Sequence, residues 1–171
     1  MEFVLVAPAD RPLWRATWVR PRALLTIDLS ELEADSTRSW FNDLPSIPET
    51  STGNNKPHKI SLRGDERVDA VKLTLVSGKR YTHGGTGGSL EELVMEDNEY
   101  WTKAKLCRGK HNGTMRNFYL AATTSARKTV AVGEMTADCR EFDVEDGWQI
   151  VGFYGEDGDE IDQLGFITAK I

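Results

Sequence analysis

The sequence is poor in the residue types that most directly mark a function. Only two of its 171 residues are cysteine and three are histidine, so neither a disulfide-rich scaffold nor a cysteine–histidine metal centre is indicated. No apolar run is long enough to span a bilayer. Residues 1–8 lack the charged start and long apolar stretch of a signal peptide.

The chain also lacks an excess of positive charge. It has 27 acidic and 21 basic residues, which gives a formal net charge of −6. A nucleic acid or an anionic membrane would not be attracted to such a protein, so we expect neither a nucleic-acid partner nor membrane insertion. The sequence contains no phosphate-binding loop and no nucleophile elbow, so we expect no enzymatic activity and no cofactor.

From residue 58 onward, short runs of alternating apolar and polar residues are separated by turn residues, which is typical of an all-β protein. The expected strands are residues 58–63, 68–76, 79–83, 89–95, 99–107, 115–123, 128–132, 139–144, 148–153 and 164–171. Residues 108–114 are expected to form a polar loop.

The first part of the chain is less regular. Residues 23–29 are a candidate strand, but three nearby prolines disfavour a long regular element, and residues 46–57 are expected to form an exposed loop. We therefore divide the chain into an N-terminal segment of unknown role, residues 1–30, and one domain, residues 31–171.

The most informative stretch lies near the end of the sequence. A turn framed by Gly158 and Asp162 joins two apolar strands and offers free backbone N–H groups beside a carboxylate. Such a turn suits a neutral polyhydroxylated ligand, because the N–H groups donate to hydroxyl oxygens and the carboxylate accepts from neighbouring hydroxyls. A solvated hairpin turn without a ligand is the alternative.

Five blocks, in order along the chain, resemble the jacalin-related lectins, most closely their single-chain, mannose/glucose-type branch. These blocks are residues 39–45 with the sequence SWFNDLP, residues 67–71, the glycine-rich residues 83–88, residues 97–100 and residues 155–165. The resemblance implies a β-prism of three four-stranded antiparallel sheets. It also implies a lectin domain that recognises neutral sugars, as monosaccharides, oligosaccharides or glycoconjugates, without a metal.

The resemblance also implies a primary sugar-binding site. Its donors would be the backbone N–H groups of Asp159 and Glu160, which follow Gly158, and its acceptor would be the carboxylate of Asp162. In the family a glycine of the first strand completes this site, but here the matching position is Arg38, which changes that wall. Acidic residues also replace the apolar ones that often follow the loop glycine.

Some members of the family have a second sugar site, and the matching residues here are Gly84, Gly85, Asp69 and, less directly aligned, Asp65. The alternative is purely structural: Asp69 caps a turn, and the glycines supply backbone conformations with positive φ.

Other functions remain open at this point. The carboxylates of residues 156–162 could instead hold Ca²⁺, although they do not fit an EF-hand loop. A glycosidase needs two opposed carboxylates, which one short turn does not provide. The main alternatives are a non-catalytic interaction module with a degenerate sugar site, and the targeting domain of a larger secreted enzyme.

The two cysteines, Cys107 and Cys139, have two interpretations that we leave open. They form a disulfide, which would imply an oxidising compartment, or they are two free buried thiols. We expect an extracellular location, with the cytoplasm as the alternative. Because a single shallow sugar site binds weakly, a homo-oligomer is a further expectation.

Overall fold

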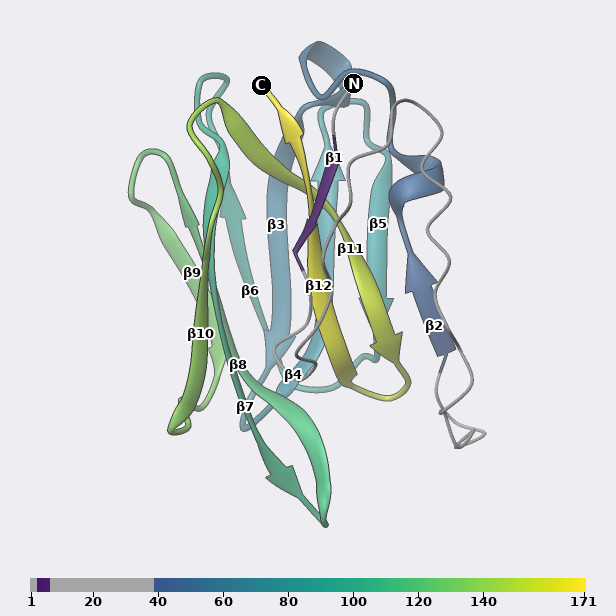
Figure 1. Ribbon diagram of the computed structural model, residues 1–171, viewed down its shortest axis with the longest axis vertical. Coiled ribbons are helices and arrows are strands. Elements are labelled where there is room, and N and C mark those ends of the chain that lie inside the picture. Colours follow the sequence, from purple (N-terminus) through teal and green to yellow (C-terminus); the bar gives the residue numbers. More distant parts are fainter. Residues whose placement is uncertain (1–2, 7–38) are drawn as a thin grey trace.

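The structure of the protein is a computed structural model that describes residues 3–6 and 39–171. In this part of the chain, twelve strands form three antiparallel sheets of four strands each (Figure 1). The expected all-β fold with three four-stranded sheets is therefore confirmed.

Two sheets are built from strands that are close in sequence, whereas the first combines a hairpin from the end of the chain with two strands from its beginning. The first sheet has the order β1 (Phe3–Val6), β12 (Ile161–Lys170), β11 (Trp148–Asp157), β2 (Ser39–Asn42). The second has the order β10 (Asp138–Asp143), β7 (Trp101–His111), β8 (Thr114–Thr124), β9 (Thr129–Gly133). The third has the order β5 (Arg80–Gly84), β4 (Val68–Leu75), β3 (Pro57–Gly64), β6 (Ser89–Val94). Two short 3-10 helices, η1 (Leu44–Ser46) and η2 (Gly53–Asn55), connect β2 to β3.

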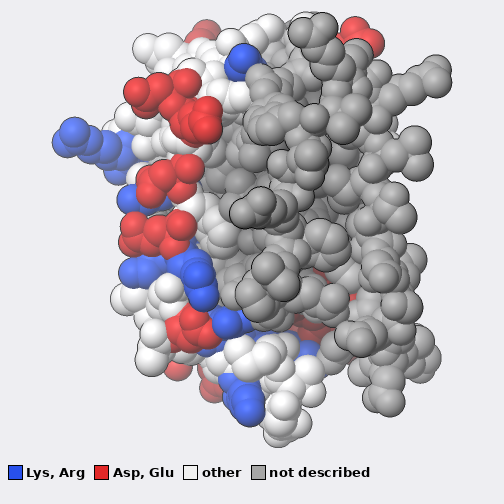
Figure 2. Space-filling view, in the orientation of Figure 1, with Lys and Arg blue, Asp and Glu red and all other residues white. Residues whose placement is uncertain are grey.

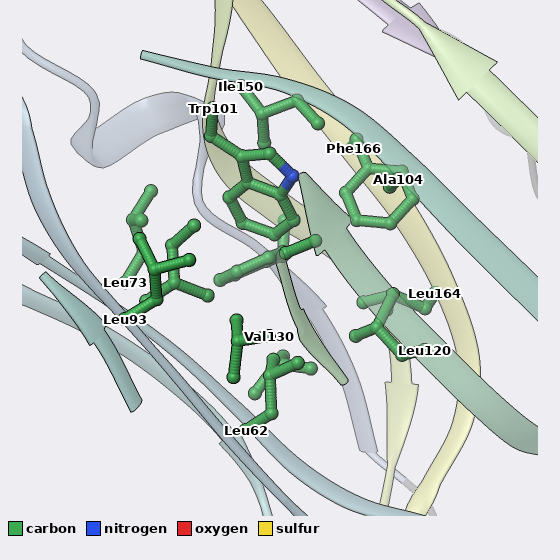
Figure 3. Close-up of a cluster of buried hydrophobic side chains, with 14 of the residues drawn as sticks. Leu62, Leu73, Leu93, Trp101, Ala104, Leu120, Val130, Ile150, Leu164 and Phe166 are labelled. Atoms are coloured by element: carbon green, nitrogen blue, oxygen red, sulfur yellow. The ribbon is translucent and has the colours of Figure 1, made fainter. Parts of the chain in front are cut away.

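The three sheets enclose one hydrophobic core, to which every sheet contributes fully buried side chains (Figure 3). Trp101 of β7 packs edge-on against Phe153 of β11 and Phe166 of β12, with ring centroids 5.8 and 5.7 Å apart. Leu62 and Leu73 of the third sheet belong to the same cluster. Aromatic pairs in this geometry add to the free energy gained by burying their apolar area.

The N-terminal segment contributes to the first sheet. Strand β1 pairs antiparallel with β12, with Phe3 opposite Ala169 and Val6 opposite Phe166. A domain that starts at residue 31 leaves this strand out. Residues 3–6, Phe-Val-Leu-Val, favour a strand locally, but the sequence does not show which strand they pair with. The candidate strand at residues 23–29 lies outside the described residues.

The expectation of a polar loop at residues 108–114 was wrong. Strands β7 and β8 run through most of this stretch and are joined by a two-residue turn, Asn112-Gly113, with φ values of 51° and 82°. Asn-Gly is the favoured pair for such turns, because both residues tolerate positive φ. The resulting long hairpin projects from one end of the prism and carries the start of β8 there (Figure 1).

The neighbouring strands β7 and β10 place Cys107 directly opposite Cys139, and the two sulfur atoms are joined in a disulfide. This bond closes a loop with a sequence separation of 32 residues. Such a cross-link stabilises a protein mainly by restricting the unfolded chain, by roughly 2–4 kcal/mol.

The same two strands carry charged side chains of both signs. Arg108 pairs with Asp138 at 2.6 Å, and Lys103 lies 3.1 Å from Glu141 and 3.2 Å from Asp143. In the view of Figure 2, acidic and basic side chains alternate along the left side of the molecule, without a continuous basic patch among the coloured residues. In the described ranges no helix is long and apolar enough to cross a membrane.

A buried carboxylate joins two of the loops between strands. Glu99, which lies between β6 and β7, is 1% exposed, and it accepts hydrogen bonds from the Lys128 ammonium at 2.7 Å, the Glu96 N–H at 3.1 Å and the Thr124 hydroxyl. Burial alone would raise the pKa of Glu99, but the hydrogen bonds from Lys128, Thr124 and Glu96 outweigh burial and lower the pKa to about 2. The ionised carboxylate therefore fixes this loop to the β8–β9 connection.

Replacing Glu99 by Gln should lower the free energy of unfolding at neutral pH by about 1–3 kcal/mol, because an amide cannot accept the charge-assisted hydrogen bonds. The pKa of Glu99 is lowered from 4.5 to about 2 on folding. The carboxylate therefore stabilises the protein above the unfolded pKa, and this contribution is lost as the pH falls toward the folded pKa. Urea unfolding at several pH values should show the difference between the two proteins shrinking below pH 4.5. A difference that stays constant down to pH 2 would contradict this account.

The disulfide predicts the labelling behaviour of the purified protein. Alkylation of the denatured chain without reductant should add no label, and alkylation after reduction should add one label at Cys107 and one at Cys139. Intact mass spectrometry distinguishes these outcomes. Two labels on the non-reduced protein would show that the thiols are free.

Candidate functional site

The candidate site residues gather at one end of the prism, at the lower end in Figure 1. The β11–β12 turn, the β3–β4 turn, the glycine-rich β5–β6 loop and the β7–β8 hairpin all lie there. The two glycine-bearing loops touch: a Cβ added to Gly85 would lie 2.2 Å from the carbonyl oxygen of Asp159. The absence of a side chain at Gly85 is therefore what allows the loops to pack this closely.

The β11–β12 turn is shorter than the sequence indicated, with only Gly158, Asp159 and Glu160 between the strands. The N–H of Gly158 donates to the carbonyl of Glu160 at 3.0 Å, which closes the turn. The N–H groups of Asp159 and Glu160 donate to no other residue among 3–6 and 39–171. Two adjacent backbone donors are thus available to a ligand.

Asp162 lies on β12 rather than in the turn, and its side chain is 7% exposed. Its Oδ1 atom is 2.9 Å from the Nε of Arg116, which comes from β8. Both atoms are shielded from solvent, and neither makes a hydrogen bond, so the contact is an ion pair by distance alone. The carboxylate expected to accept sugar hydroxyls is therefore held in an ion pair with a different sheet.

Glu160 is held by two arginines. Its carboxylate lies 2.5 Å from the Nε of Arg67, in the β3–β4 turn, and 3.6 Å from the Nε of Arg116. The acidic turn is thus part of an ion-pair network rather than a solvated cluster of carboxylates. Within the described ranges, no group of three or more His, Cys, Asp or Glu side chains is placed to hold a metal ion.

The glycine-rich loop uses its backbone donors within the protein. The N–H of Gly84 donates to the Asp157 carboxylate at 2.7 Å, and the N–H of Gly85 donates to the carbonyl of Asp69 at 2.9 Å. Gly84 has a φ of +90°, and a Cβ there would lie 2.1 Å from the same Asp69 carbonyl. The loop is therefore pinned to the start of β4.

The expected second site is brought together, but its groups also make structural contacts. The Asp69 carboxylate lies against Gly87 and Gly88, and the Oδ1 atom of Asp65 accepts from the N–H of Ser89 at 3.0 Å. Burial and, next, the charge of Glu160 raise the pKa of Asp69. Glu160 therefore acts electrostatically on both candidate sites.

A partly buried histidine next to these loops was not among the expected site residues. His83 lies with its Nε2 2.9 Å from Asp43 and its Nδ1 4.0 Å from Asp157, and its ring stacks on Phe41 at 3.8 Å. Asp43 also accepts from the N–H of Phe153 at 2.9 Å. His83 thus connects β2, β5 and β11 and has a structural role beside the site.

Sequence reasoning missed Arg67 and Arg116 as site residues. Arg67 is the first residue of a block that resembles the lectin family, residues 67–71, and Arg116 lies in the expected strand 115–123, directly after the expected loop. A hairpin signal at Asn112-Gly113 would have placed Arg116 at this end of the prism. Arg38, the expected extra wall of the primary site, lies outside the described residues.

Comparison with known proteins shows which protein family has a similar sequence. The profile of the jacalin-like lectin domain family matches residues 43–167. No individually curated protein sequence shows a significant match.

Several solved plant lectins share the fold. Malaysian banana lectin matches with a TM-score of 0.60 and 25% identity, over 67% of this chain and 84% of that one. A mannose binding jacalin related lectin from Ananas comosus has a TM-score of 0.59 and 24% identity, over 72% of this chain and 89% of that one. Calystegia sepium agglutinin has a TM-score of 0.61 and 19% identity, over 79% of this chain and 89% of that one.

Two glycine substitutions test how tightly the glycine-rich loop is packed. Gly78 and Gly84 have similar φ values, +86° and +90°, but a Cβ would meet nothing within 4 Å at Gly78 and the Asp69 carbonyl at Gly84. Gly78→Ala should cost only the left-handed backbone strain, about 1–2 kcal/mol. Gly84→Ala should cost at least about 1 kcal/mol more, because the Asp69 backbone must move. Denaturant unfolding measures both, and equal costs would show that the loop yields freely.

Proposed function

This chain belongs to the jacalin-like lectin domain family, and we propose on that basis that it binds neutral sugars of the mannose or glucose type without a metal ion. The family's domain is a non-catalytic carbohydrate-binding domain, in agreement with the expectation that the chain is not an enzyme. The observation that carries the proposal is the pair of available N–H donors on the β11–β12 turn, beside the fixed carboxylate of Asp162.

The proposed binding chemistry is a set of hydrogen bonds to one sugar ring. The N–H groups of Asp159 and Glu160 donate to a ring or hydroxyl oxygen, and the Asp162 carboxylate accepts from two neighbouring hydroxyls.

The sugar class is inferred from relatives. The lectin from Ananas comosus is described as mannose binding, and artocarpin has been solved as a complex with mannotriose. Metal independence is inferred from the charges: Arg67 and Arg116 neutralise Glu160 and Asp162, so the acidic turn has no need of a cation.

Binding at this site should be weak. A shallow polar site replaces water with contacts of similar quality, so we expect a dissociation constant near 1 mM, about −4 kcal/mol. Useful avidity then calls for several sites or a homo-oligomer. An extracellular location is proposed with the lectin function, and the Cys107–Cys139 disulfide supports an oxidising compartment.

A second candidate function rests on a different observation. The donors of Gly84 and Gly85 are used within the chain, and Asp162 is largely buried beside Arg116. These features favour a non-catalytic interaction module in which the sugar sites have lost their capacity.

A glycan array with and without EDTA tests the proposal, using the native protein and Asp162→Asn. Mannose- or glucose-type glycans should bind equally well with EDTA, and binding should fall at least tenfold in the variant, because an amide is a weaker acceptor and one of its two groups only donates. Asp138→Asn is the matched control, since that carboxylate also pairs with an arginine but lies on β10. Loss of binding in EDTA would assign the acidic turn a metal, and a blank array from folded protein would favour the interaction module.

A further inference from the structure

We propose that the outer face of the third sheet binds an anionic polysaccharide, one that carries sulfate or uronate groups along an extended chain. The contact is made by a stripe of cations, which we define as Arg63, Lys72 and Arg80. This stripe lies outside both candidate sugar sites. The proposal therefore goes beyond the recognition of neutral sugars and does not depend on it.

The three cations come from three strands of the third sheet, β3, β4 and β5. Each is followed or preceded in sequence by a residue of the hydrophobic core, namely Leu62, Leu73 and Tyr81. Because successive side chains of a strand point to opposite faces, the cations point away from the core. The third sheet lies behind the first in Figure 1, so this outer face is on the side of the molecule that Figure 2 does not show.

The cations form one diagonal line across the sheet. On β3, Lys72 lies opposite Ser61, two residues before Arg63. On β5, Lys72 lies opposite Thr82, two residues after Arg80. Diagonal neighbours on adjacent strands are roughly 7–8 Å apart. The stripe thus offers positive charges at regular intervals along a line, which suits an extended chain with repeated anionic groups better than one compact anion.

The outer face is positive although the whole chain has a formal net charge of −6. Lys59 is a fourth cation at the outward positions of β3 to β6, and Glu92 is the one carboxylate there, paired with Lys59 at 3.0 Å. Within residues 3–6 and 39–171, no ion pair neutralises Lys72 or Arg80. Charges farther away than about 10 Å are largely screened at physiological salt. An anion on this face therefore meets the local positive charge rather than the net charge of the chain.

The remaining side chains of the face favour a polysaccharide over other polyanions. The hydroxyl of Thr82, beside the stripe, can hydrogen-bond to sugar or sulfate oxygens. The outward positions of β3 to β6 hold no aromatic side chain, whereas proteins that bind single-stranded nucleic acids stack bases on aromatic rings. The exposed apolar side chains, Leu90 and Val94, are 45% and 53% exposed and lie on the edge strand β6, away from the stripe. A protein or membrane contact that buries apolar area would be centred on them instead.

The experiment measures, by calorimetry, the affinity for heparin, which is sulfated, and for polygalacturonate, which carries only carboxylates. The native protein should bind at least one of them, more weakly as the salt concentration rises. Lys72→Gln removes the central charge of the stripe and should weaken binding by about two- to fivefold. The double variant with Arg80→Gln should weaken it about tenfold or more. Binding of heparin alone would assign the face to sulfate groups, and binding of both polymers would assign it to anionic sugars in general.

Two further variants control for net charge and for folding. Lys110→Gln makes the same change of charge at an exposed lysine on the distant β7–β8 hairpin, and its affinity should equal that of the native protein. Glu92→Gln removes the carboxylate from the outer face and should tighten binding about twofold. Such a gain cannot result from unfolding.

Equal losses in Lys72→Gln and Lys110→Gln would overturn the proposal, and so would folded protein that binds neither polymer. Tighter binding of duplex DNA, or of vesicles that contain anionic lipid, in the same buffer would assign the face to a different partner and overturn it as well.

This proposal and the lectin function fail independently. Saturating methyl α-mannoside should leave heparin binding unchanged, and Lys72→Gln should leave mannoside binding unchanged, because the two ligands occupy different surfaces. If mannoside displaces heparin, the polysaccharide occupies the neutral sugar site and the assignment to the outer face is wrong. A blank array of neutral glycans would contradict only the lectin function.

Discussion

The architecture depends on the contact of three aromatic rings, those of Trp101, Phe153 and Phe166, where the first and second sheets meet over the third. Three sheets can share one core only if their inward faces bring side chains large enough to fill the axis between them. Once the sheets are closed in this way, their strands run roughly along the prism, and the connecting turns are confined to its two ends (Figure 1). Binding groups on such a scaffold therefore come from turns that are remote in sequence.

Ion pairs then hold together the turns at the end of the prism that carries the candidate site. The β11–β12 turn is fastened to the β3–β4 turn through Arg67 and to β8 through Arg116, and the glycine-rich loop lies directly against it. Isolated ion pairs at a surface contribute little, but largely buried ones constrain geometry because breaking one leaves an uncompensated charge. In the sequence, the acidic residues of this turn suggest a metal-binding or solvated cluster. In the structure, the Glu160 carboxylate pairs with Arg67 and Arg116, and these ion pairs restrict the turn.

The sequence was sufficient to predict the fold class and most strands, because alternation and turn residues are local signals. Strand β4, for example, was expected at 68–76 and is found at Val68–Leu75. The edge strand β1 was not predicted: its four residues favour a strand, but no local pattern shows that they pair with β12. At the site, Asp162 and the donors of Asp159 and Glu160 could be anticipated from the family pattern. The partner of Asp162 could not, because no local pattern links a residue on β8 to one on β12.

The pairing of β1 with β12 has a consequence for how the domain can be attached to something else. Phe3 lies opposite Ala169, and this end of the first sheet is far from the β11–β12 turn, at the opposite pole of the prism (Figure 1). A tether joined near either position would attach the protein at this end of the prism. The β11–β12 turn and the loops beside it would then point away from the attachment point. Copies displayed on a scaffold or a surface in this way would all present the same pole to their surroundings.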